Sequence, residues 1–135
     1  MKKTGTILLS IFTLVTLQAQ NNKFNLLIGT YTQSCDSKGI YVYDFDSKTG
    51  DFSFKNATEK VVNPSYLTVS KENKYVYSVN EFGAESTVSS FSYNPTSGKL
   101  DLINTQSSKG ADPCYIINDD KNVLSYTLSI CLMSF

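Results

Sequence analysis

The sequence of 135 residues contains no histidine and no tryptophan. Without histidine, the chain lacks the commonest general base and the commonest metal ligand of proteins. Lysine plus arginine and aspartate plus glutamate both number 12, so the net charge is zero. Binding to nucleic acid or to an anionic membrane surface needs an excess of positive charge. We therefore expect neither nucleic acid nor a membrane as a partner.

Motifs for metals and cofactors are also missing. Cys35, Cys114 and Cys131 fit no zinc pattern, because none of them lie two to four residues apart. Residues 44–51, "DFDSKTGD", resemble a calcium loop, but Lys48 would put a cation where a ligand oxygen belongs. The sequence has no glycine-rich phosphate loop, metalloprotease motif or serine elbow. We expect no metal and no cofactor.

Long hydrophobic runs are rare, and the clearest one lies at residues 7–17. This run is too short to span a bilayer. Lys2 and Lys3 precede it, and Ala19 offers a small residue for cleavage, which together predict a bacterial signal peptide over residues 1–19. A buried first strand or helix is the alternative. Export would leave residues 20–135 in the periplasm or outside the cell, where a Cys35–Cys114 disulfide or isolated thiols are both compatible with the spacing.

The remaining sequence has the composition of β-strands. Tyrosine and phenylalanine supply all of the 13% aromatic content, and valine, isoleucine and threonine are frequent. No segment shows a convincing helical period. Alternating or β-branched runs predict strands at residues 26–31, 40–46, 52–57, 66–69, 74–80, 87–93, 100–105 and 115–117.

The chain also repeats itself. "NPSY" from Asn63 aligns with "DPCY" from Asp112 at an offset of 49 residues, and two further pairs of segments agree with this offset to within one residue. Turns with glycine, at 47–50 and 95–98, recur in the same register. Each unit thus reads as four short antiparallel strands in about 49 residues. Tandem units of this kind predict an all-β protein built from propeller blades. A β-sandwich is the alternative, but it does not explain the fixed offset.

Several segments resemble the lactonase family of seven-bladed β-propellers, which includes bacterial 6-phosphogluconolactonases and fungal carboxymuconate cycloisomerases. They are "LLIGTYT", "GIYVYDFDSKTGDF", "NPSYLTVSKENKYVYSVNE", "VSSFSYNPTSGKL" and "GADPCYI", in the order of the family. The resemblance covers residues 25 to about 123. It implies a seven-bladed propeller and, for exported members, a soluble periplasmic protein that acts on a sugar lactone or related cyclic ester.

The chain departs from that family in length and in composition. Residues 20–123 hold about two blades, and the family's histidine-containing motifs, which lie in later blades, have no counterpart here. We therefore interpret the chain as an N-terminal fragment of a propeller lactonase that is inactive by itself. A propeller that binds glycan or protein without catalysis is the alternative. Exposed blade edges also predict self-association.

The last residues lose the repeat. Residues 124–135, "LSYTLSICLMSF", carry no charge, and the positions that correspond to Asn80 and Gly83 hold Ser129 and Leu132. Two interpretations stay open: a non-native tail from a change of reading frame, and a divergent last strand of a short protein.

Candidate ligand-binding residues follow from the repeat register. Ligands of propellers usually sit at the mouth of the central channel, which corresponds here to Tyr31, Thr32, Asn80, Glu81, Asp112 and Cys114. Glu81 is the one carboxylate of this set that directly follows a buried strand, so it is the candidate to act as a general base or to orient a water. A solvated loop charge is the alternative for Glu81, and a turn before Pro113 is the alternative for Asp112. Without histidine as its base, Cys114 is expected to serve packing.

Overall fold

The computed structural model describes residues 22–119 and 125–129, and the predicted signal peptide and Cys131 lie outside them. These residues form nine strands and no helix, so none of their elements could cross a bilayer as a helix. The strands are β1 (Lys23–Gly29), β2 (Ile40–Asp46), β3 (Phe52–Ala57), β4 (Pro64–Val69), β5 (Tyr75–Asn80), β6 (Thr87–Asn94), β7 (Lys99–Ser107), β8 (Pro113–Asn118) and β9 (Ser125–Ser129).

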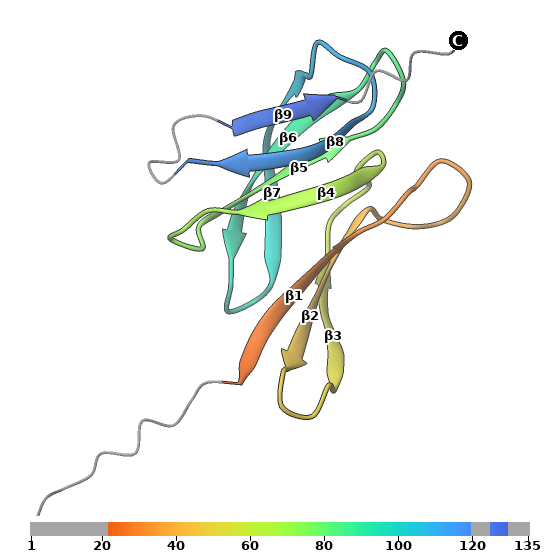
Figure 1. Cartoon of the computed structure of the whole chain (residues 1–135). Helices are drawn as coiled ribbons and strands as arrows, with labels where there is room; N and C mark the ends of the chain where they lie inside the picture. The colour runs from red at the N-terminus through yellow and green to blue at the C-terminus, as the bar shows by residue number, and fades with distance from the viewer. Residues whose placement is uncertain (1–21, 120–124, 130–135) are drawn as a thin grey trace, which may run out of the picture.

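The strands form three successive antiparallel sheets (Figure 1). The first sheet has the order β1-β2-β3, the second β4-β5-β6-β7, and the third β8-β9. Every hydrogen-bonded neighbour is the next strand in the sequence, as expected for the meander of a propeller blade. The all-β prediction and the propeller-type sheets are thereby confirmed.

The three sheets share one strand arrangement but contain different numbers of its strands. β1 pairs with β2 as β5 pairs with β6, so β1 takes the second position of a four-stranded unit. Among the residues that the structure describes, the first sheet therefore has no counterpart of β4. Within the described residues only the second sheet has four strands, and the expectation of four strands in each unit was wrong for the first.

The third sheet continues the register of the second. Pro64 lies opposite Asn80 in β4–β5, and Pro113 lies opposite Ser129 in β8–β9. Both pairs have a register shift after the proline, where the chain cannot donate a ladder hydrogen bond. At the level of the backbone, β9 therefore occupies the place of β5, although its sequence no longer follows the repeat.

The main core lies between the first and second sheets. Period-two alternation in β2 directs Ile40 and Val42 toward the second sheet, and both side chains are fully buried. They pack in one cluster with Val76, Phe91, Tyr93 and Leu100. Near this core, Gly29 approaches the second sheet so closely that an added Cβ would lie 2.1 Å from the Pro64 carbonyl oxygen. The two sheets thus have a fixed separation at this point.

A lysine adds a polar link between the same sheets. Lys55 Nζ on β3 donates to Asn25 Oδ1 (2.9 Å) and to the Pro95 carbonyl oxygen (3.1 Å), which belongs to the turn after β6. It also forms an ion pair with Asp44 at 2.8 Å. The Lys55 side chain is only 16% exposed, so this cation is largely withdrawn from water.

The opposite face of the first sheet is apolar and uncovered. Phe52 and Phe54 on β3 are 67% and 63% exposed, and both contact Tyr43 edge-to-face. Phe24, Leu26 and Ile28 extend this face along β1. Exposed apolar surface of this extent marks a site of interaction. Self-association through it stays a prediction.

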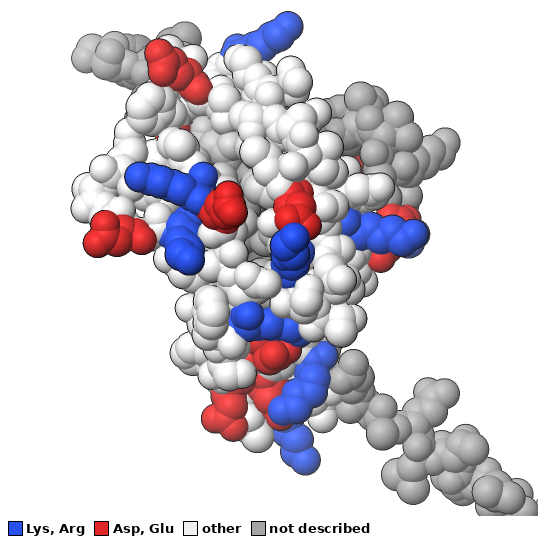
Figure 2. Space-filling model, turned by 180° about the vertical axis from the view of Figure 1, so that it is seen from behind, with Lys and Arg blue, Asp and Glu red and all other residues white. Residues whose placement is uncertain are grey.

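Charged side chains are dispersed over the surface. On the face drawn in Figure 2, lysine and acidic side chains alternate and form no patch of one sign. This distribution agrees with the zero net charge of the sequence.

Candidate functional site

Two of the predicted site residues lie in loops at the same end of the sheets. Tyr31 follows β1 and Glu81 follows β5, which are corresponding strands of successive units. The loop with Tyr31 is held at its base, because Thr30 donates to the Gly39 carbonyl oxygen through both its amide (2.8 Å) and its hydroxyl (2.9 Å). Gly39 allows this closure with a φ of 104°.

The Tyr31 and Glu81 side chains meet. The Tyr31 hydroxyl donates a hydrogen bond of 2.5 Å to Glu81 Oε2. This bond raises the pKa of Tyr31 above its ordinary value, and partial burial and the negative charges of Glu81 and Asp112 act in the same direction. All three residues therefore share one electrostatic environment. The sequence-based grouping of Tyr31 with Glu81 corresponds to a direct contact.

Asn63 joins the two loops that carry this pair. Its side-chain oxygen accepts from the Thr32 amide (2.9 Å), and its side-chain nitrogen donates to the Glu81 carbonyl oxygen (2.8 Å). The Asn63 amide donates to Thr32 Oγ1 (3.1 Å). Asn63 is 1% exposed and has a φ of 38°, a conformation that asparagine tolerates better than most residues. It thus fixes Tyr31 and Glu81 relative to each other through their backbones.

Asp112 makes the corresponding connection one unit later. Asp112 Oδ1 accepts from the Gly83 amide (2.7 Å), and the Asp112 amide donates to Ser86 Oγ (3.0 Å). The φ of Asp112, 43°, is close to that of Asn63. Asn63 thus binds the loop after β1, and Asp112 binds the corresponding loop after β5. Their position before a proline predicts only a local turn, so these longer-range contacts go beyond that prediction. Asp112 organises the loop that follows Glu81.

The side chain of Asn80, the last residue of β5, points away from Tyr31 and Glu81. It is 4% exposed, and its Nδ2 donates to Ser89 Oγ (2.6 Å) and Thr87 Oγ1 (3.0 Å). Ser78 Oγ donates to Asn80 Oδ1 (2.7 Å). The side-chain amide is thus satisfied by protein groups. Alternation along β5 explains the difference, since Asn80 and Glu81 are neighbours in sequence and point in opposite directions.

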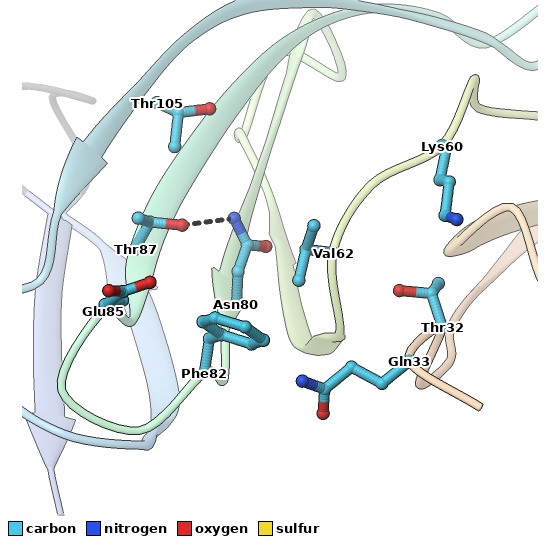
Figure 3. A pocket seen from close by; sticks show the side chains of 9 residues that line it. All are labelled: Thr32, Gln33, Lys60, Val62, Asn80, Phe82, Glu85, Thr87 and Thr105. Atoms are coloured by element: carbon cyan, nitrogen blue, oxygen red, sulfur yellow. Dashed lines mark hydrogen bonds between the residues drawn. The ribbon is translucent and has the colours of Figure 1, made fainter.

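Asn80 forms part of the wall of a pocket of about 440 Å³, here called the inter-sheet pocket (Figure 3). Residues from the loops of the first sheet and from the ends of β5, β6 and β7 surround it. They are Thr32, Gln33, Lys60, Val62, Asn80, Phe82, Glu85, Thr87 and Thr105. Of these residues, the repeat register predicted only Thr32 and Asn80. The available signal was the alternation in β5 and its extension, which places Ser78, Asn80 and Phe82 on one face.

The cysteines do not contribute a site within the described part of the chain. Cys35 and Cys114 are not joined by a disulfide. Among residues 22–119 no group of three or more cysteine and acidic side chains is arranged to hold a metal ion. Cys35 instead donates to the Tyr31 carbonyl oxygen at 3.3 Å, which adds a further contact to the Tyr31 loop.

Comparison with protein families gives a match over residues 25–127 to the family described as "Lactonase, 7-bladed beta-propeller". Two similar proteins are the 6-phosphogluconolactonases of Bacillus subtilis, 32% identical over 95 residues, and Formosa agariphila, 30% identical over 93 residues. These alignments cover 70% and 67% of this chain but 27% and 26% of the relatives. The chain thus spans about a quarter of their length.

Solved structures give the same result. A Bacteroides fragilis protein is 44% identical with a TM-score of 0.70, over 75% of this chain and 28% of that protein. The periplasmic gluconolactonase of Pseudomonas aeruginosa is 30% identical with a TM-score of 0.71, over 78% of this chain and 30% of that protein. The three sheets therefore correspond to a contiguous part of larger propellers.

Proposed function

Because this chain belongs to the lactonase family of seven-bladed β-propellers, we propose that it supplies the first blades of an exported hydrolase that opens a sugar lactone. The contact between Tyr31 and Glu81 at 2.5 Å is the observation that supports this proposal most strongly. It places a carboxylate and a phenol together on loops of successive blades, where propeller ligands usually bind. The names of the relatives, 6-phosphogluconolactonase and gluconolactonase, supply the substrate class.

Glu81 would act as the general base of the reaction. Among residues 22–119, Tyr31 is the hydrogen-bond partner of its carboxylate, and it binds Oε2. Oε1 would accept a proton from water as the water oxygen attacks the lactone carbonyl carbon. The ring carbon–oxygen bond then breaks, and the proton passes to the released oxygen to give an open-chain hydroxy acid. Tyr31 would hold the carboxylate in the orientation that this transfer needs.

The described blades would hold only part of this site. A group that stabilises the developing oxyanion typically contributes a factor of about 10² to 10³ in rate, and we assign no residue of this chain to that role. We expect it to come from blades beyond those described here. The 135-residue chain by itself is therefore proposed to be inactive.

Export is a second part of the proposal. The charged start, the apolar run at residues 7–17 and Ala19 favour a cleaved signal peptide. The periplasmic location named for the Pseudomonas aeruginosa neighbour is consistent with it. Mass spectrometry of the protein expressed in a Gram-negative host tests this directly. A periplasmic product that begins at Gln20 is expected, and a cytoplasmic product that keeps Met1 would contradict export.

A hybrid enzyme tests the proposed reaction. Residues 25–127 of this chain would replace the matching segment of the Bacillus subtilis relative, and hydrolysis of 6-phosphogluconolactone would be followed by the release of acid. We expect turnover by the hybrid and none by the 135-residue chain. A hybrid that unfolds cooperatively, as the relative does, but opens no lactone would contradict the proposal and favour a binding propeller.

A further inference from the structure

The loop that carries Glu81 ends in a serine that is buried from solvent. This loop spans residues 81–86 between β5 and β6, and its last residue, Ser86, is 0% exposed. Within the described part of the chain, Ser86 makes no hydrogen bond to the side chain of Tyr31 or Glu81. Any influence of Ser86 on that pair therefore passes through the backbone.

The Ser86 hydroxyl uses its full hydrogen-bonding capacity inside the protein. Its Oγ accepts from the Phe82 amide at 2.9 Å and from the Asp112 amide at 3.0 Å. It donates to the Gly83 carbonyl oxygen at 2.7 Å, with Asp112 Oδ1 as a more distant acceptor at 3.4 Å. A hydroxyl has one hydrogen to donate and two lone pairs, and all three are engaged here. Loss of the hydroxyl would take a partner from two amides and one carbonyl oxygen.

The peptide group between Glu81 and Phe82 is held at both of its polar ends by buried side chains. The Glu81 carbonyl oxygen accepts from Asn63 Nδ2 at 2.8 Å, and the Phe82 amide donates to Ser86 Oγ. The Glu81 amide in turn donates to the Asn63 carbonyl oxygen at 3.1 Å. Because a peptide group is planar, bonds at both ends fix its orientation. They thereby fix the direction in which the Glu81 side chain leaves the backbone toward Tyr31.

Ser86 also connects this loop to the third unit. Ser108 donates to the Ser86 carbonyl oxygen through both its amide (3.1 Å) and its hydroxyl (2.9 Å). Asp112, directly before β8, donates its amide to Ser86 Oγ. The segment 108–112, which leads from the second sheet to the third, is thus bonded to Ser86 at both of its ends. A shift of this segment would move Ser86 and, with it, the peptide group after Glu81.

We propose that Ser86 is a positioning residue for Glu81, which fixes the direction of the Glu81 side chain and couples it to the segment that leads into the third sheet. Asn63 makes the corresponding link to the first unit, so Glu81 is held from both neighbouring units. The geometric role of Ser86 needs no chemistry. Its consequence for lactone opening rests on the proposed function of Glu81 as the base.

The titration of Tyr31 in the 135-residue chain measures this role. The hydrogen bond to Glu81 raises the pKa of Tyr31, and a Glu81 side chain that is no longer held in place would make that bond less often. Ser86→Ala should therefore lower the pKa of Tyr31 toward its ordinary value. NMR of chain labelled at tyrosine Cζ follows the titration, with Tyr31→Phe used to assign the signal.

Ser70→Ala is the matched control. Ser70 is 2% exposed, and its Oγ accepts from the Lys74 amide (3.2 Å) and the Tyr75 amide (3.1 Å) in the turn between β4 and β5. This turn lies at the other end of the two strands from Glu81. Ser70→Ala should destabilise the fold, as Ser86→Ala does, but should leave the pKa of Tyr31 unchanged. The comparison separates positioning from stability.

Ser86→Cys serves if Ser86→Ala does not fold. A thiol is a weaker donor and acceptor than a hydroxyl but fills the same place, so the pKa of Tyr31 should fall by a smaller amount. The hybrid enzyme gives a second readout in a larger fold. There Ser86→Ala should lower kcat at least about tenfold and change KM less than about twofold, since a misplacement of about 1 Å can cost about a hundredfold in rate. Ser70→Ala should leave kcat unchanged.

An unchanged pKa of Tyr31 in folded Ser86→Ala or Ser86→Cys would overturn the proposal, and so would an equal fall in Ser70→Ala. The two proposals fail separately. If the Glu81→Gln hybrid keeps its full rate, Glu81 is not the base, yet a lowered pKa of Tyr31 in Ser86→Ala still supports the positioning role. If Glu81→Gln abolishes turnover while Ser86→Ala changes neither kcat nor the pKa of Tyr31, the base is supported and the role of Ser86 is refuted.

Discussion

Asn63 and Glu81 are joined by two hydrogen bonds that run in opposite directions. Asn63 Nδ2 donates to the Glu81 carbonyl oxygen at 2.8 Å, and the Glu81 amide donates to the Asn63 carbonyl oxygen at 3.1 Å. Since Asn63 also accepts from the Thr32 amide, a single buried side chain ties the first two units together. The geometry of the Tyr31–Glu81 pair depends on this link.

Replacement of Asn63 by alanine should reduce the free energy of unfolding by about 2–4 kcal/mol, because the Thr32 amide and the Glu81 carbonyl oxygen lose their buried partner. Urea unfolding of the 135-residue chain measures this change. Asp112→Asn is the control: it keeps an acceptor for the Gly83 amide and should cost less than about 1 kcal/mol. Equal losses at both positions would contradict the special role of Asn63.

The two Asx-Pro segments show how far the sequence predicts this region. Their spacing of 49 residues indicated a repeat, and the local chemistry indicated a turn before each proline. The side chains instead reach residues 31 and 29 positions away, Thr32 from Asn63 and Gly83 from Asp112. A contact at that separation depends on how two sheets pack, which no local pattern encodes. The repeated register alone could have suggested that both side chains bind equivalent loops.

The Tyr31–Glu81 bond predicts a pH dependence. The pKa of Tyr31 is raised in the folded protein because the hydrogen bond to Glu81 and nearby negative charge favour the neutral phenol. The unfolded chain therefore loses this proton first as pH rises. The stabilising contribution is fully present below the ordinary tyrosine pKa and is lost as pH rises through the folded pKa.

Glu81→Gln should lower the pKa of Tyr31 toward its ordinary value, since it removes the charge that acts on the phenol. NMR of chain labelled at tyrosine Cζ follows this titration, with Tyr31→Phe used to assign the signal. Glu72→Gln, in the turn between β4 and β5, should leave the titration unchanged. A Tyr31 pKa that is the same in Glu81→Gln and in the unmodified chain would argue against the contact.

Lys55 should contribute more to stability than other paired lysines. It bonds Asn25, Asp44 and Pro95 while only 16% exposed, whereas Lys99 and its partner Asp101 are about 60% exposed. Lys55→Met should therefore reduce the free energy of unfolding by about 1.5–3 kcal/mol. Lys99→Met should change it by less than about 1 kcal/mol. Thermal unfolding of both variants compares them, and equal midpoints would show that the Lys55 link adds nothing.

Gly29 should tolerate no side chain. An added Cβ would lie 2.1 Å from the Pro64 carbonyl oxygen, so the first two sheets would have to separate. We expect Gly29→Ala to cost about 1–3 kcal/mol, in the range of overpacked cores, and to weaken the protection of the Ile40 and Val42 amides from hydrogen exchange. At Gly50 nothing lies within 4 Å of the added atom, but a φ of 80° strains an alanine there. Gly50→Ala should therefore cost stability at the β2–β3 turn, yet leave the Ile40 and Val42 amides better protected than in Gly29→Ala. Unchanged exchange in Gly29→Ala would contradict the close approach.

Strand bounds were predictable where turns are local. β2 and β3 have the predicted limits, because the turn between them is closed by its own residues: the Gly50 amide donates to the Asp46 carbonyl oxygen at 2.8 Å. β1 was predicted at residues 26–31 and lies at Lys23–Gly29. Its end is set by the tertiary bonds of Thr30 to Gly39 and of Thr32 to Asn63, which direct the chain away from the sheet. The end of β1 could therefore not be predicted from the local sequence, because it depends on contacts with residues far away in the chain.

The rate of lactone opening by the hybrid enzyme with Glu81→Gln tests the account most directly. Loss of a general base should lower kcat by a factor of about 10² to 10⁴, with little change in unfolding temperature. Glu59→Gln, an exposed carboxylate in the loop after β3, should retain full activity. A Glu81→Gln hybrid that hydrolyses the lactone as fast as the Glu59→Gln hybrid would contradict the assignment of Glu81 as the base.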